Sequence, residues 1–95
     1  MTVKLVKIEP SSRSEKKYQA IFEEDGRTRK VHFGAKGYDD FTLTNDVTQR
    51  DLYRKRHQKD LKGDPTKPGY LSYYILWNKP TLSASISDYK RRFNL

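Results

Sequence analysis

The sequence predicts an α+β fold: an N-terminal antiparallel sheet of about three strands, with one clear hairpin, packed against two or three C-terminal helices. Three observations carry this prediction. Apolar and polar residues alternate in the first third of the chain, an Asp-Gly pair separates two such segments, and apolar residues recur every three or four positions near the C-terminus. At 95 residues, the chain is expected to form a single domain over 1–95, with its sheet part at 1–34 and its helical part at 44–93.

Period-two alternation indicates the strands of this sheet. Lysines separate the apolar residues of the first segment, and a Glu-Pro pair at 9–10 ends it. Tyr18, Ala20 and Phe22 then share one face of a second segment. An Asp-Gly pair at 25–26, the strongest short-range signal for a hairpin, joins it to a third. The expected strands are Thr2–Ile8, Lys17–Glu23 and Thr28–Phe33.

Capping residues and an apolar stripe indicate helices in the remainder. Asp46 followed by Gln49 is typical of a helix start, and Thr81 can cap the last helix. Segment 70–77 is ambiguous: the Pro-Gly pair before it favours a short buried helix, and a buried strand is the alternative. The expected helices are Val47–Lys59, Tyr70–Trp77 and Leu82–Phe93, with loops at 34–42 and 62–69.

The same periodicities predict the core and leave a few aromatic residues outside it. Tyr38 and Phe41 lie in the glycine-flanked loop and are expected to be free to contact a partner. Large aromatic residues with helical or strand spacing belong to the core instead. The expected core is Leu5, Tyr18, Ala20, Phe22, Val31, Phe33, Leu71, Tyr74, Ile75, Trp77, Leu82, Ile86, Tyr89 and Phe93.

Composition excludes several classes of protein. The chain has no cysteine, so neither a disulfide framework nor a thiolate metal site is expected. The longest apolar run, Tyr73–Trp77, is too short to cross a bilayer, and no apolar segment follows Met1. We therefore expect a protein that is neither secreted nor membrane-bound, with no metal, no cofactor and no small-molecule substrate.

A surplus of positive charge points to a polyanionic partner. Twenty lysine and arginine residues against twelve acidic ones give a net charge of +8, which favours binding to the phosphate backbone of DNA without sequence preference. The surplus is greatest in residues 62–95, whose only acidic residues are Asp64 and Asp88.

Helical spacing divides the basic residues of segment 47–59 into two sets. Arg50, Arg54 and His57 fall on the side that faces the protein. Because buried cations need partners, we expect structural ion pairs that clamp the preceding loop, through Asp39 and Asp40, to this inner set. The outer set, Lys55, Arg56 and Lys59, is the better candidate for phosphate contacts.

The last expected helix ends in a run of three cations, Lys90, Arg91 and Arg92. Such a run is typical either of a solvated helix C-terminus, where cations suit the helix dipole, or of phosphate contacts. The candidate nucleic-acid-binding residues are Lys36, Lys55, Arg56, Lys59, Lys79, Lys90, Arg91 and Arg92.

Catalysis is not expected. No nucleophile with a positioned base is visible, and the glycines of the 34–42 loop lack the phosphate-binding motif of nucleotide hydrolases. Asp39 and Asp40 together with His57 suggest, as a third hypothesis, a small metal-dependent nuclease. A turn plus a satisfied histidine explains these residues without any catalytic role.

Three stretches of the chain carry a family signature. They read KYQAIF followed by HFGAKGYDDFT (17–22 and 32–42), RKRH (54–57), and GYLSYYILWNKPTL followed by ASI and DYKRRF (69–82, 84–86 and 88–93). Over residues 17–93 the chain resembles a family of small basic proteins, of no established function, encoded by large nucleocytoplasmic DNA viruses of algae and protists.

This resemblance implies a viral protein in the virion or the infected host cell. In that setting a small basic protein would bind DNA in genome packaging or in the virion core. The alternative is a minor capsid or other structural protein of the virion that docks on larger subunits.

Overall fold

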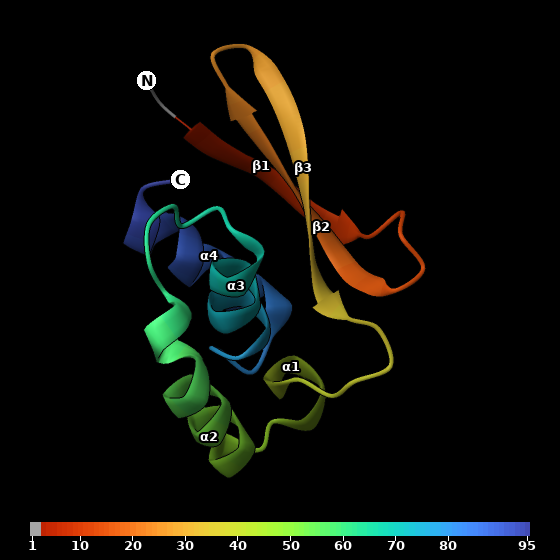
Figure 1. Cartoon of the computed structure of the whole chain (residues 1–95), viewed down its shortest axis with the longest axis vertical. Helices are drawn as coiled ribbons and strands as arrows, with labels where there is room; N and C mark the ends of the chain where they lie inside the picture. Colours follow the sequence, from red (N-terminus) through yellow and green to blue (C-terminus); the bar gives the residue numbers. More distant parts are fainter. Residues whose placement is uncertain (1–2) are drawn as a thin grey trace.

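The computed structural model describes residues 3–95 and confirms the α+β architecture (Figure 1). A three-stranded antiparallel sheet in the order β1-β2-β3 precedes the helices. Leu5, Phe22 and Phe33 lie on the face of the sheet that joins the helices in one core. The elements are β1 (Val3–Pro10), β2 (Lys16–Glu24), β3 (Arg27–Ala35), α1 (Phe41–Thr44), α2 (Val47–His57), the 3₁₀ turn η1 (Gln58–Asp60), α3 (Pro68–Leu71), the π-helix η2 (Ser72–Leu76) and α4 (Leu82–Phe93).

Strand β1 continues beyond its expected end because it contains a β-bulge. The pairing with β2 shifts between Leu5 and Lys7, which leaves the exposed Val6 as the extra residue. The shift brings Ile8 onto the same face as Leu5, three positions away, which regular alternation cannot do. Pro10 is tolerated because β1 is an edge strand. Thr2, which was expected to begin this strand, lies outside the described residues.

The hairpin between β2 and β3 is confirmed. Asp25 and Gly26 both have positive φ, 52° and 79°, as a type I′ turn requires. On the outer face of β2, the amide of Gln19 is buried and donates to the Glu9 carboxylate of β1. Side chains therefore cover part of both faces of this central strand.

A short helix, α1, begins within segment 34–42, which was expected to be a loop. The Asp40 side chain caps it by accepting from the backbone N–H of Thr42 at 2.9 Å. Phe41, expected to be free, is buried in the core under the guanidinium of Arg50, which lies 4.8 Å from its ring centroid. The expectation for Phe41 is wrong, because the cap turns the chain inward at this position.

The N-termini of the two longer helices are as predicted. Asp46 accepts from the N–H of Gln49 at the start of α2, and Thr81 accepts from the N–H of Ala84 at the start of α4. Helix α2 ends two residues early and continues as η1. No helix among residues 3–95 is long and apolar enough to cross a membrane.

Segment 70–77 is helical, as favoured, but only its first part is α-helix. From Ser72 to Leu76 the chain forms a π-helix, and this wider turn buries Tyr73 and Leu76 instead of Tyr74. Tyr74 remains partly exposed and packs against the core. The predicted core residues that lie at its rim in the same way are Tyr18, Val31, Leu82, Ile86 and Phe93.

Candidate nucleic-acid interface

Helix α2 is held to the protein by cations and one aromatic stack, since none of its residues is buried. The ring of Tyr53 stacks on that of Trp77, with centroids 4.4 Å apart and planes 10° apart. Arg50 donates to the carbonyl oxygen of Asn78 at 3.3 Å. The outward face of the helix is therefore free to carry solvated charge.

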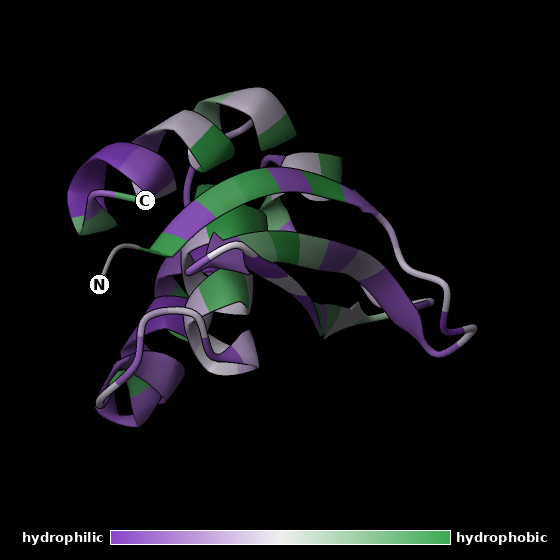
Figure 2. Ribbon diagram, turned by 90° about the horizontal axis from the view of Figure 1, so that it is seen from above, coloured by the Kyte–Doolittle hydropathy of each residue, from purple (hydrophilic) through white to green (hydrophobic). Residues whose placement is uncertain are grey.

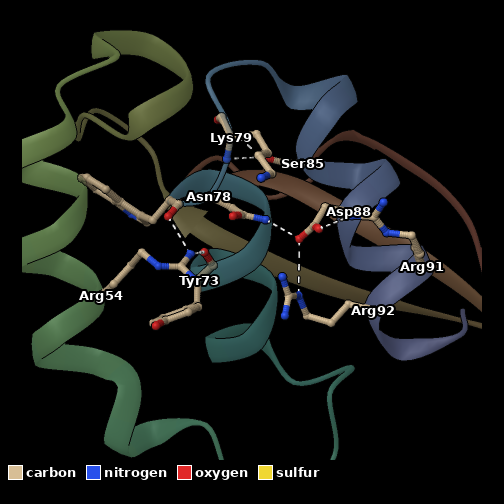
Figure 3. A network of polar contacts seen from close by, with 9 residues as sticks. Arg54, Tyr73, Asn78, Lys79, Ser85, Asp88, Arg91 and Arg92 are labelled. Atoms are coloured by element: carbon tan, nitrogen blue, oxygen red, sulfur yellow. Dashed lines mark hydrogen bonds and ion pairs between the residues drawn. The ribbon is translucent and has the colours of Figure 1, made fainter.

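Arg54 makes the closest attachment of α2. Its Nη1 donates to the carbonyl oxygens of Trp77 at 3.0 Å and Tyr73 at 3.3 Å (Figure 3). These carbonyls lie at the C-terminal end of η2, where helical backbone acceptors lack partners and the helix dipole favours a cation. The same guanidinium lies 4.1 Å from the ring centroid of Tyr73. Arg54 is a structural residue.

The expected clamp between the 34–42 loop and α2 is not formed. Asp40 is buried and paired, but its partner is Lys17 of β2, whose Nζ lies 2.6 Å from Asp40 Oδ2. Asp39 is exposed and forms no ion pair among the described residues. The clamp thus joins this loop to the sheet, and spacing along the chain could not show that.

The remaining inner residues of α2 also have other partners than the loop. Arg50 pairs with its neighbour Asp51 at 3.0 Å. His57 lies 3.2 Å from Asp60 of η1 and packs against Tyr53, with ring centroids 4.2 Å apart and planes tilted by 31°. The inward orientation of Arg50 and Arg54 is confirmed, whereas the His57 side chain is 44% exposed. The expected pairing of these residues with Asp39 and Asp40 is wrong.

Asp88 of α4 is a buried carboxylate with three donors around it (Figure 3). Asn78 Nδ2 lies 2.7 Å, Arg91 Nη2 2.9 Å and Arg92 Nε 3.4 Å from its oxygens. Burial alone would raise the pKa of Asp88, but the hydrogen bonds from Asn78 and the two arginines hold this pKa below its ordinary value. Both arginines are therefore partly occupied within the protein.

The basic last turns of α2 and α4 meet at one tyrosine. Arg54 of α2 and Arg92 of α4 lie 5.6 Å and 5.3 Å from the ring centroid of Tyr74. Lys55 and Lys59 follow on the exposed side of α2 and η1 and form no ion pair among residues 3–95. Tyr74 thus connects the positive charge of two helices.

The positive surface continues over α4 to the sheet. Lys90 and Arg91 line a hollow of about 770 Å³ together with Lys4 of β1. Figure 2 shows the hydrophilic colouring of the C-terminal end of α4 beside the label C. We call this run of cations from α2 across Tyr74 and α4 to β1 the basic belt. Its residues are Lys55, Lys59, Arg92, Arg91, Lys90 and Lys4, and the structural residue Arg54 lies beneath it at Tyr74.

Three predicted contact residues lie outside the basic belt. Lys36 follows the last residue of β3, Lys79 precedes α4, and Arg56 turns to the opposite flank of α2. All three are exposed and form no ion pair among the described residues. The structure therefore separates the predicted set into a belt and three scattered cations.

A groove of about 470 Å³ lies beside Arg56, between the end of β3 and α2. The loop before α1 supplies Tyr38 and Asp39, α2 supplies Gln49, Tyr53 and Arg56, and η2 and its C-cap supply the opposite wall. Gly34 forms part of the wall, with φ of +80°, and a Cβ here would lie 2.8 Å from Leu76 Cδ1. The groove thus combines aromatic, cationic, amide and carboxylate side chains.

The residues of the nuclease hypothesis do not form a metal site in this structure. Asp40 is bound to Lys17, and His57 lies against Asp60. Within residues 3–95, no three histidine or acidic side chains are grouped so that they could hold a metal ion.

The sequence interpretation missed three contributors to this surface. Lys4 was considered only as an alternating strand residue, and Tyr74 only as core. Asp88 precedes Arg91 and Arg92 by three and four residues, a helical spacing typical of ion pairs that could have predicted their interaction.

Comparison with known protein families identifies the N-terminal part of the chain. Residues 6–57 match a family that is described as a family of unknown function (DUF5754). No curated protein and no solved structure matches the chain. The matched residues cover the second part of β1, then β2, β3, α1 and α2, and end before α3 and α4.

Proposed function

The chain belongs to this family of unknown function, DUF5754, and we propose that it binds nucleic acid without sequence preference, through the basic belt. The binding is non-enzymatic. Lysine and arginine side chains contact phosphates, and the affinity comes largely from the release of counterions. Contacts of this kind position a protein on a nucleic acid but read no bases.

The observation that carries the proposal is the continuity of the basic belt. Arg54 and Arg92 approach the same tyrosine from two helices, and Lys90, Arg91 and Lys4 line one hollow. The acidic residue beneath this surface, Asp88, is buried and already engages two arginines. Asp88 therefore offsets only part of the charge of the α4 cations, and the exposed Asp60, which follows Lys59, is a further carboxylate next to the belt.

The proposed setting is genome packaging or the virion core of a large DNA virus. The support is the signature over residues 17–93, together with the net charge of +8. In that setting the partner is packaged DNA, and a protein without base readout can coat any sequence.

A salt series on duplex DNA tests the proposal. If the belt makes about four phosphate contacts, affinity falls by about a hundredfold between 50 and 200 mM salt. An affinity that does not change with salt would contradict the proposal. Charge reversal at Arg91 or Arg92 is a poor test, because it also breaks their ion pairs with Asp88.

A second candidate function is that of a minor capsid or other virion structural protein. Three large apolar side chains on α1 and α2, Leu43, Val47 and Leu52, are exposed, and such residues suit contacts with another protein. Fractionation of virions separates the two functions. A structural protein stays with emptied shells, whereas a DNA-binding protein leaves with the genome.

A further inference from the structure

We infer that the groove between β3 and α2 holds one unstacked base of a single strand, so that this protein prefers single-stranded to duplex nucleic acid. The inference rests on the proposed function and adds the class of ligand that the protein takes. It concerns a surface separate from the basic belt, which carries affinity for phosphates alone.

The size and shape of the groove suit a base. Its volume of about 470 Å³ lies within the range of sites for small ligands. Gly34 lets the strand end approach η2 closely, because its φ of +80° and the 2.8 Å between its position for a Cβ and Leu76 leave no room for a side chain. The wall there is backbone and apolar side chain, a surface on which a flat ring can lie.

One exposed aromatic side chain supplies the stacking surface. Tyr38, on the loop before α1, is 73% exposed and lines the groove. Trp77 also lines the groove, but it is 8% exposed and one face of its ring is covered by Tyr53, so it forms part of the wall. A base that stacks on an aromatic ring gains affinity whatever its identity, since every base has a π face.

Two side chains at the groove match a nucleotide, whereas the carboxylate of Asp39, which also lines the groove, would repel a phosphate placed beside it. Arg56 is exposed, forms no ion pair among residues 3–95, and can reach a phosphate. The carbonyl oxygen of the Gln49 side chain accepts from Thr44 Oγ1 at 3.2 Å, so that its NH₂ group can donate to the edge of a base. Lys36 adds a further cation next to Ala35 of the wall.

A single strand fits this arrangement better than a duplex. Bases in a duplex are stacked and paired, and inserting one in a groove first costs the energy of unpairing it. Bases of a single strand are already free to leave their neighbours and stack on aromatic side chains. A free nucleotide has the same base and phosphate, so the experiment must separate it from a strand.

Trp77 is the only tryptophan of the chain and lines the groove, so its fluorescence reports on the site directly. The probes are a thymidine oligonucleotide of about eight nucleotides, an abasic strand with the same number of phosphates, a duplex of equal length, and thymidine monophosphate. We expect the thymidine strand to quench Trp77 and to bind at least about fivefold more tightly than the abasic strand.

Substitution of Tyr38 tests whether the gain in affinity for bases comes from the groove. Tyr38→Ala is expected to lose at least about fivefold in affinity for the thymidine strand and none for the abasic strand or the duplex. Tyr38→Phe keeps the ring and should bind as the parent does. Leu43→Ala, at an exposed apolar residue outside the groove, is the matched control and should change none of these affinities.

The outcomes separate the two proposals. Equal binding of thymidine and abasic strands, both lost at high salt, would overturn the groove and leave the basic belt standing. Tight binding of the monophosphate without any gain for the strand would overturn the strand as ligand. Binding of none of the probes at low salt would overturn both proposals.

Discussion

The Nη1 of Arg54 lies 3.0 Å from the carbonyl oxygen of Trp77, so that a cation of α2 caps the C-terminal end of the π-helix. The last carbonyl oxygens of a helix have no partner within it, and two of them here accept from a guanidinium. This contact fixes α2, which buries no residue of its own. The position of the outer cations of α2 therefore depends on an inner one.

Arg54→Ala is expected to destabilise the protein by about 2 kcal/mol, because two hydrogen bonds from a charged donor are lost and two carbonyls lose their partner. Arg56→Ala, at the other flank of the same helix, should cost no more than about 0.5 kcal/mol. Urea denaturation of the two variants measures the difference. Equal stabilities would show that Arg54 does not hold α2.

Amide hydrogen exchange should show that α2 opens more easily than α4. Helix α2 is attached through cations and one aromatic stack, whereas α4 buries Ser85, Asp88 and Tyr89. We expect the amides of α2 to exchange through local opening at a lower free energy than those of α4. Arg54→Ala should accelerate exchange in α2 and leave α4 unchanged. The same exchange rates for both helices in the parent protein would contradict this account.

Asp88 should make the protein sensitive to acid. Because its pKa is lowered in the folded state, its contribution to stability is complete above its ordinary pKa and is lost as the pH falls through the lowered one. The substitution Asp88→Asn should lower the free energy of unfolding by about 1–3 kcal/mol at pH 7. Below about pH 4, the variant should lose less stability than the parent does. Thermal denaturation against pH measures both effects.

In the Asp88→Asn variant, two other carboxyls still make the stability of the protein fall at acid pH. A hydrogen bond from Gln19 lowers the pKa of Glu9, and hydrogen bonds from Thr66 lower that of Asp64. Asp51→Asn, which removes only an exposed ion pair, is the control and should change stability by less than about 1 kcal/mol. If the stabilities of Asp88→Asn and of the parent fall in parallel as the pH falls, the Asp88 network contributes nothing to the acid sensitivity.

Two glycines with the same backbone conformation should respond differently to alanine. Gly34 and Gly37 have φ of +80° and +92°, but only at Gly34 would a Cβ meet another atom, 2.8 Å away on Leu76. Gly37→Ala is expected to cost about 1 kcal/mol for the left-handed backbone. Gly34→Ala adds a clash in the core and should cost about 1–3 kcal/mol more. Equal costs in denaturant titrations would show that β3 does not approach η2 as described.

Features that depend on local pattern were predicted from the sequence. The Asp25-Gly26 turn, the cap at Asp46 and the apolar stripe of α4 each need only neighbouring residues. The bulge at Val6 is different, because it shows only in the pairing of β1 with β2. The odd spacing of Leu5 and Ile8 was its one trace in the sequence.

Contacts between distant segments could not be predicted in the same way. Asp40 was assigned an arginine of the next helix, yet Lys17, twenty-three residues earlier in the chain, is its partner. Arg54 was expected to need a carboxylate, and two backbone carbonyls satisfy it instead. Helical spacing showed that Arg54 faces inward, but only the packing of η2 against α2 decides which acceptors it meets.

Matched triple variants test the basic belt most directly. Lys55→Gln, Lys59→Gln and Lys90→Gln together remove three charges from the belt. Lys16→Gln, Arg27→Gln and Lys30→Gln remove three charges from β2 and β3. None of these six residues forms an ion pair within residues 3–95, so both proteins should fold and carry the same net charge.

The decisive measurement is the slope of duplex affinity against salt for these two variants. We expect the belt variant to lose affinity and to reduce the slope by about three, while the sheet variant keeps a slope within about one of the parent. Equal loss of affinity and slope in both variants would contradict the account, because net charge alone, and not the belt, would then explain the binding.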